Sequence, residues 1–98
     1  MKYSVKFPSD SVQKKFQKAL QSLSSRKLQE EIMQAIESLA DNPRPYGEPK
    51  IKPPIIVYQY SAQYRMRVRE FRILYDVDDK NKIVWIFTLR KRNERTYH

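Results

Sequence analysis

Hydrophobic and polar residues alternate at the start of the chain and then follow a helical period. Over residues 2–7 every second side chain is apolar, which predicts a half-buried strand that Pro8 ends. Apolar residues then recur every three or four positions in two stretches, 12–23 and 28–39, and this spacing predicts two amphipathic helices. The pair Ser24-Ser25 breaks the pattern and can cap the second helix. Such a short break favours two antiparallel helices packed as a hairpin.

The second half of the chain has the pattern of strands. The sequence Asn-Pro-Arg-Pro at 42–45 stops the second helix, and a loop rich in proline follows it. Four stretches are then rich in β-branched and aromatic side chains, which predicts four strands at residues 55–60, 64–68, 71–77 and 83–89. The last stretch is apolar on both faces, as expected of a central strand, and residues 78–81 are typical of a hairpin turn. The predicted fold is therefore α+β: an N-terminal strand, an α-helical hairpin and a four-strand antiparallel meander, in a single domain spanning residues 1–98.

Composition excludes several classes of site. The 98 residues contain no Cys, one His (His98) and one Gly (Gly47). We therefore expect no disulfide framework, no Cys- or His-based metal cluster, no Ser-His-Asp triad and no glycine-rich phosphate cradle. No apolar run is long enough to span a bilayer, and the N-terminus lacks the apolar segment of a signal peptide. We expect a compact cytoplasmic domain with no membrane association, no metal and no cofactor.

The net charge points to a polyanionic partner. Lys and Arg number 20 against 11 Asp and Glu, which gives a formal charge of +9. Seven of the nine arginines follow residue 64, so the charge is concentrated on the predicted strands and the C-terminal segment. Arg65 and Arg67 share one face of their strand, and Arg72 joins that face if the turn between the strands keeps the register. Arg90 and Arg92 come directly after the predicted central strand. Five guanidinium groups on one concave side suit phosphate binding, although a solvated outer face of a basic protein is an alternative explanation.

Most aromatic residues have the spacing of core positions. Tyr64 and Tyr97 are less well explained by the core pattern, and either Tyr58 or Tyr60 is a further candidate. A tyrosine that lies beside arginines can stack on an unpaired nucleobase.

The order of the predicted elements and one long stretch resemble a known family. Asn-Pro-Arg-Pro closes the second helix, and the stretch YRMRVREFRILYDVDDKNKIVWIFTLRKRNERTY fills residues 64–97. This set resembles the RelE/ParE superfamily of type II toxin–antitoxin toxins. Members have a Tyr-Arg-x-Arg/Lys-Val strand, a tight turn, a Tyr/Phe-Arg-Ile/Leu strand and a closing basic pair followed by a tyrosine. The resemblance covers nearly the whole chain.

The RelE branch of this superfamily implies an endoribonuclease that cleaves mRNA in the ribosomal A site without a metal. By this resemblance Arg65 and Arg67 match the basic pair of the third strand, and Arg72 matches the phosphate-binding arginine. Arg92 matches the arginine proposed as general acid, and Tyr97 matches the tyrosine that stacks on or orients the substrate. Further expected RNA-binding residues are Lys52, Arg90, Lys91 and Arg95. The implied partners are the ribosome with its mRNA and a cognate acidic antitoxin.

Three features depart from the family pattern. The usual Gly-Asp turn is replaced by Arg69-Glu70, although arginine disfavours the positive φ that a tight hairpin can demand. The third strand carries Arg where close RelE members carry Lys, and arginine barely loses its proton to act as a base. Glu48 matches a glutamate that a related branch uses as the base, but the sequence favours an exposed loop carboxylate without a role.

Two other functions remain open from the sequence. A ParE-like toxin would have the same fold and would inhibit DNA gyrase by binding it, without RNase activity. A basic RNA-binding module without catalysis is the third candidate.

Overall fold

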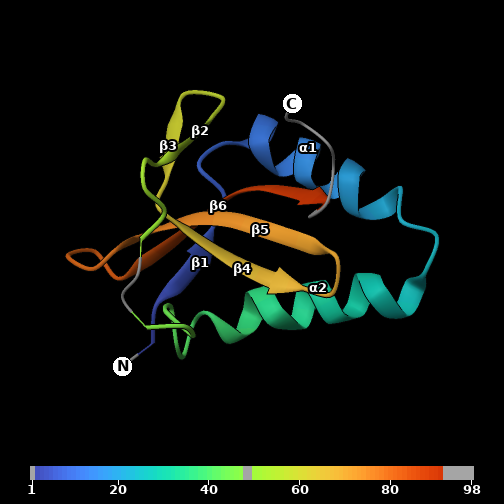
Figure 1. The fold of residues 1–98 in the computed structure, drawn as a ribbon, viewed down its shortest axis with the longest axis horizontal. Helices are drawn as coiled ribbons and strands as arrows, with labels where there is room; N and C mark the ends of the chain where they lie inside the picture. Colours follow the sequence, from blue (N-terminus) through green and yellow to red (C-terminus); the bar gives the residue numbers. More distant parts are fainter. Residues whose placement is uncertain (1, 48–49, 92–98) are drawn as a thin grey trace.

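The computed structural model describes residues 2–47 and 50–91 and has the predicted α+β architecture. The elements follow in the order β1 (Ser4–Lys6), α1 (Asp10–Gln21), α2 (Arg26–Ser38), β2 (Ile55–Val57), β3 (Tyr60–Ala62), β4 (Tyr64–Val68), β5 (Phe71–Asp78) and β6 (Ile83–Lys91). Figure 1 shows the two helices running in opposite directions along the sheet, as predicted.

Each helix begins at a serine that caps it. The Ser9 Oγ accepts a hydrogen bond from the backbone N–H of Val12 at 3.2 Å. The Ser25 Oγ accepts one from the backbone N–H of Leu28 at 3.1 Å. Each cap satisfies an N–H group that the first turn of a helix leaves without an internal partner. The predicted boundary at Ser24-Ser25 is thereby confirmed, with Ser25 as the capping residue.

The main sheet has four strands in the order β1-β6-β5-β4. The three strands β4, β5 and β6 form an antiparallel meander, and β1 adds parallel to β6. The long strand β6 is therefore central, as its apolar residues on both faces predict. Strand β4 lies at the edge of the sheet (Figure 1).

The predicted strand at 55–60 is wrong in extent and in place. It is two short strands, β2 and β3, which pair with each other in a separate two-stranded sheet. The break falls at Tyr58, which takes a left-handed backbone conformation with φ 59°. The hairpin buries Val57 and Ala62 in a small cluster with Leu74 of β5 and Phe87 of β6. This apolar contact places the hairpin on the second face of the main sheet, the face opposite the helices. The meander therefore has three strands instead of four.

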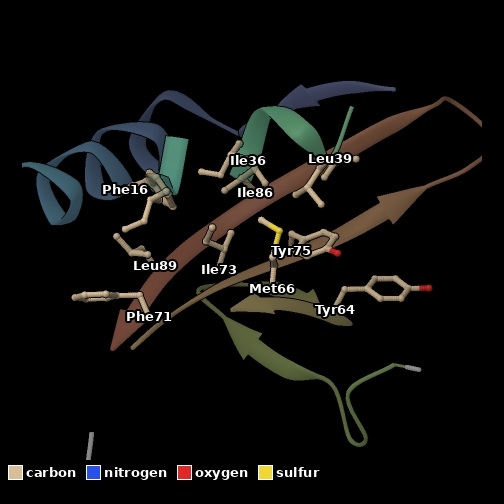
Figure 2. Packing of buried hydrophobic residues seen from close by; sticks show 12 residues of the cluster. Phe16, Ile36, Leu39, Tyr64, Met66, Phe71, Ile73, Tyr75, Ile86 and Leu89 are labelled. Carbon is tan, nitrogen blue, oxygen red and sulfur yellow. The ribbon is translucent and has the colours of Figure 1, made fainter. Parts of the chain in front are cut away.

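The principal core lies between the helices and the first face of the sheet. Its buried helix-side residues are Phe16, Ile32, Ile36 and Leu39, and its strand residues include Met66, Ile73, Ile86 and Leu89 (Figure 2). Tyr64 belongs to this core, with only 5% of its surface exposed, and its ring stacks on Tyr75 at 5.7 Å. The suggestion that core packing explains Tyr64 poorly is therefore wrong.

No helix among residues 2–47 and 50–91 is long and apolar enough to cross a membrane. Within the same ranges no three or more His, Cys, Asp or Glu side chains are grouped so that they could hold a metal ion.

Candidate nucleic-acid interface

Three arginines form a row across the second face of the sheet, opposite the helices. Arg67 of β4 pairs with Arg72 of β5, and Arg72 pairs with Arg90 of β6. Residues directly opposite each other in a sheet share a face. The turn between β4 and β5 thus keeps the register that the predicted cluster requires. Arg67 and Arg90 are exposed, whereas Arg72 in the middle of the row is half-buried.

The backbone hydrogen-bonding pattern of the strands sets the distances between the Cα atoms of the three arginines. The backbone N–H of Arg67 points away from β5, because it donates to the hydroxyl of Tyr46 at 3.1 Å. Arg67 and Arg72 are therefore a non-hydrogen-bonded pair, whose Cα atoms lie about 4.5 Å apart. Arg72 turns its backbone groups toward β6, and its Cα lies about 5.5 Å from that of Arg90. The three arginines thus lie side by side on three adjacent strands.

A β-bulge places Arg90 in the row. The register between β5 and β6 shifts between Leu74 and Tyr75, where Leu74 pairs with Thr88 but Tyr75 pairs with Ile86. The extra residue is Phe87. Strict alternation from the buried Ile86 would turn Arg90 toward the helices, and the bulge reverses this. The bulge therefore decides which of the basic residues at the end of β6 joins the arginine row.

Arg65 lies on the same face of β4, two residues before Arg67, and both line an open pocket of about 460 Å³. The other lining residues come from the loop between α2 and β2: Tyr46, Lys50 and Ile51. The backbone N–H of Ile51 donates to the carbonyl of Gln63 at 2.8 Å, which holds this side of the loop against the start of β4. The described part of the pocket lining thus includes three cationic side chains and one aromatic ring.

Arg44 anchors the first part of the loop between α2 and β2. Its guanidinium donates to the Asp79 carboxylate at 2.5 Å and to the Tyr64 hydroxyl at 3.1 Å. The Asp79 carboxylate also accepts a hydrogen bond from the Tyr3 hydroxyl at 2.6 Å. These contacts raise the pKa of Arg44, with the bond to Asp79 the larger cause, and they lower the pKa of Asp79. Arg44 therefore ties the loop to the turn between β5 and β6.

A second anchor is the buried Tyr75. Its hydroxyl donates to the backbone carbonyl of Pro43 at 2.8 Å. Burial raises the pKa of this phenol, which keeps it neutral and able to donate. The loop that carries Tyr46 is thus held from the sheet as well as from the β5–β6 turn.

Several predicted site residues lie elsewhere or outside the described residues. Lys91 pairs with Phe71 and so lies on the helix side of the sheet, where its ammonium is 3.9 Å from the Glu70 carboxylate. Lys52 is exposed in the loop before β2 and does not line the pocket. The positions outside the described residues are Glu48, Arg92, Arg95 and Tyr97.

The unusual Arg69-Glu70 turn is stabilised from helix α2. Arg69 adopts a positive φ of 56°, the conformation that arginine disfavours. Its guanidinium contacts Glu31 through two hydrogen bonds, of 2.5 and 3.0 Å. These bonds lower the pKa of Glu31, so the carboxylate remains charged. The ion pair accompanies a backbone conformation for which glycine is the ordinary choice.

Sequence reasoning did not identify Tyr46, Lys50 or Arg44 as parts of this region. They lie in an irregular loop, where no hydrophobic period indicates which way a side chain points. The only available signal was Tyr46 itself, a large aromatic residue between Pro45 and Gly47 and outside every core pattern.

Comparison with solved structures gives the same fold. The RelE–RelB complex from the archaeon Pyrococcus horikoshii matches with 26% identity and a TM-score of 0.68, covering 97% of this chain and 100% of that chain. The toxin–antitoxin complex RelBE of E. coli matches with 19% identity and a TM-score of 0.64, covering 95% and 99%. The RelBE2 complex of Mycobacterium tuberculosis matches with 22% identity and a TM-score of 0.54, covering 96% and 95%. No curated protein matches the sequence significantly.

A family model matches almost the entire chain. It describes the ParE toxin of the type II toxin–antitoxin system parDE, and it aligns with residues 7–96. The fold, the register of the strands and this match agree with the resemblance that the sequence indicates. The chain therefore belongs to the ParE toxin family of type II toxin–antitoxin systems, within the RelE/ParE superfamily.

Proposed function

We propose that this toxin is a ribosome-dependent endoribonuclease that cleaves mRNA in the A site, in the cytoplasm. The observation that carries the proposal is the row formed by Arg67, Arg72 and Arg90. Like charges directly opposite each other weaken strand pairing. A phosphate bound between them would remove this repulsion, which makes the row suited to a phosphodiester.

The proposed reaction uses the nucleophile that RNA carries. The 2′-OH attacks the adjacent phosphorus and gives up its proton, the bond from phosphorus to the 5′-oxygen breaks, and that oxygen takes up a proton. The products are a 2′,3′-cyclic phosphate and a free 5′-OH. Negative charge accumulates on the phosphorane oxygens, and cationic donors that are already in place stabilise it.

Each arginine has a proposed role in that reaction. Arg67 and Arg72 stabilise the phosphorane, because their strands hold them in register. Arg65 holds a phosphate at the pocket or assists deprotonation of the 2′-OH. Arg92 favours the leaving 5′-oxygen and Tyr97 stacks on or orients the substrate, roles that rest on the resemblance to RelE. Glu48 is the candidate general base.

The ribosome completes the site in this proposal. Arginine is a poor base because its guanidinium keeps its proton in proteins, so none of the arginines can efficiently take up the proton of the 2′-OH. Positioning of the 2′-OH in line with the leaving oxygen supplies a large part of the rate. We therefore expect little cleavage of free RNA.

The proposed antagonist is a cognate antitoxin with an acidic segment. The structures from P. horikoshii and E. coli are complexes of the toxin with RelB. The formal charge of +9 on this chain favours a partner of opposite charge.

The match to the ParE toxin model favours a second candidate, inhibition of DNA gyrase by protein binding. This candidate requires neither an in-register arginine row nor a pocket beside it. The two functions make opposite predictions about RNA. A gyrase inhibitor blocks supercoiling with purified gyrase and leaves mRNA intact.

Primer extension on a translated mRNA tests the proposal. Purified toxin is added to ribosomes programmed with a defined codon in the A site, with and without translation factors. Cleavage inside that codon is expected only when the ribosome is present. Intact mRNA together with inhibition of gyrase supercoiling would show that the second candidate is correct.

A further inference from the structure

An exposed aromatic ring stands beside the cationic pocket. Tyr46 has 57% of its surface exposed. It lines the pocket together with Lys50, Arg65 and Arg67. Among the described residues, Tyr46 belongs to neither of the two apolar clusters.

The ring is nevertheless held in place. Its hydroxyl accepts the hydrogen bond from the backbone N–H of Arg67, on the free edge of β4. The turn that presents it is closed by a bond of 2.9 Å from the Gly47 N–H to the Arg44 carbonyl. Gly47 has φ 89°, a conformation that glycine adopts without a steric cost. Arg44 is in turn fixed by Asp79.

An anchored, exposed ring among cations is the arrangement that binds single-stranded nucleic acid. The cations contact the phosphates, and the ring offers a flat surface on which an unstacked base can lie. Since the Tyr46 hydroxyl is already engaged by β4, the ring is oriented before a ligand arrives. Pre-ordering of this kind reduces the entropy lost on binding.

We propose that Tyr46 is a base-stacking platform, which receives one nucleobase of the RNA strand while Arg65 and Arg67 bind the neighbouring phosphates. This inference rests on the proposed function for its substrate class, RNA. It adds a residue of the α2–β2 loop to the proposed RNA contacts.

The test measures binding without cleavage. The probe is a short, fully 2′-deoxy oligonucleotide that contains one 2-aminopurine, whose fluorescence is quenched when the base stacks. It is titrated into the purified full-length toxin at low salt. Three variants are compared with the wild type: Tyr46→Phe, Tyr46→Leu and, as the matched control, Tyr58→Leu. Tyr58 is also an exposed tyrosine at a turn, but it lies under the Lys15 ammonium and does not line the pocket.

Tyr46→Phe keeps the ring, so quenching is expected with affinity within about threefold of wild type, since only one exposed hydrogen bond is lost. Tyr46→Leu is expected to abolish the quenching and to weaken binding by roughly 5- to 150-fold, the usual range for one base–aromatic stack. Tyr58→Leu is expected to bind as the wild type does. Circular dichroism of each variant verifies that the fold is intact.

Unchanged quenching in Tyr46→Leu would overturn the platform. Wild-type affinity in Tyr46→Leu would also overturn it, because binding would then not depend on the ring. The two proposals fail separately: absence of mRNA cleavage by the wild type contradicts the nuclease, whereas this binding assay requires no cleavage.

Discussion

Arg67 and Arg72 lie directly opposite each other on adjacent antiparallel strands, with their side chains on the same face of the sheet. The pairing depends on the two-residue turn Arg69-Glu70, which Glu31 of α2 holds through Arg69. A shift of one residue in this register would turn one side chain of the pair toward the core. The core of the fold thus determines the geometry of the candidate site.

Arg72 is the central member of the row, and its replacement tests the assigned role. Arg72→Ala is expected to lower ribosome-dependent cleavage by roughly 10²- to 10³-fold, the usual effect of removing one charge-stabilising donor. The matched control is Arg26→Ala, which removes an exposed arginine from the start of α2. Cleavage rates are measured by primer extension, and folding by circular dichroism. Full activity in a folded Arg72→Ala protein would remove this residue from the mechanism.

The contact between Tyr75 and Pro43 predicts a stability effect. Tyr75→Phe deletes one partly buried hydrogen bond and leaves the carbonyl of Pro43 without this donor. The expected cost is about 1 kcal/mol, which corresponds to a fall in Tm of roughly 4–8 °C for a domain of this size. Differential scanning calorimetry measures it. An unchanged Tm would contradict a stabilising role for this bond.

The lowered pKa of Asp79 predicts that the stability of the protein depends on pH. Its pKa is lowered in the folded protein by the hydrogen bonds from Arg44 and Tyr3. A carboxyl group whose pKa falls on folding stabilises the protein above its unfolded pKa, and it loses that contribution as pH falls through the folded pKa. For Asp79 the loss therefore occurs below the ordinary value of 3.8.

The variant Asp79→Asn removes this contribution and is expected to be less stable than the wild type at neutral pH. The difference in Tm between the two proteins should shrink as pH falls below about 4. Some acid sensitivity must remain in the variant, because the pKa values of Glu31 and Asp78 are also lowered. A constant difference in Tm from pH 7 to pH 2 would contradict the assigned role of the Asp79 charge.

Charge complementarity predicts how the antitoxin binds. The affinity of the cognate antitoxin should fall steeply with salt, since attraction between exposed charges is screened over about 10 Å at 0.1 M. Titration calorimetry at several salt concentrations measures the slope. An affinity that is independent of salt would assign the binding to apolar contacts instead.

The fold was largely predictable because its elements have clear periods. The apolar residues of the two helices recur at a helical period, and β6 is apolar on both faces. Each of these patterns indicates one type of element. The hairpin of β2 and β3 was not predictable from that period. It depends on a left-handed Tyr58 and on apolar contacts with Leu74 and Phe87, which are distant in sequence.

The site was predictable only in part, for a related reason. The shared face of Arg65 and Arg67 follows from alternation within one strand. The place of Arg90 depends on the bulge opposite Leu74 and Tyr75, and alternation alone gives the wrong face. Tyr46 lies in a loop whose path is set by tertiary contacts with Asp79 and Arg67.

The central claim is that RNA is cut by its own 2′-OH beside the arginine row. The most direct test is a single 2′-deoxy substitution at the cleaved nucleotide of the A-site codon, on ribosomes supplied with the wild-type toxin. The substitution removes the nucleophile and keeps the phosphate that the arginines contact. Primer extension should show cleavage of the all-RNA message and none at the substituted bond. Cleavage of the deoxy substrate at the same bond would mean that water is the nucleophile, and it would contradict the mechanism.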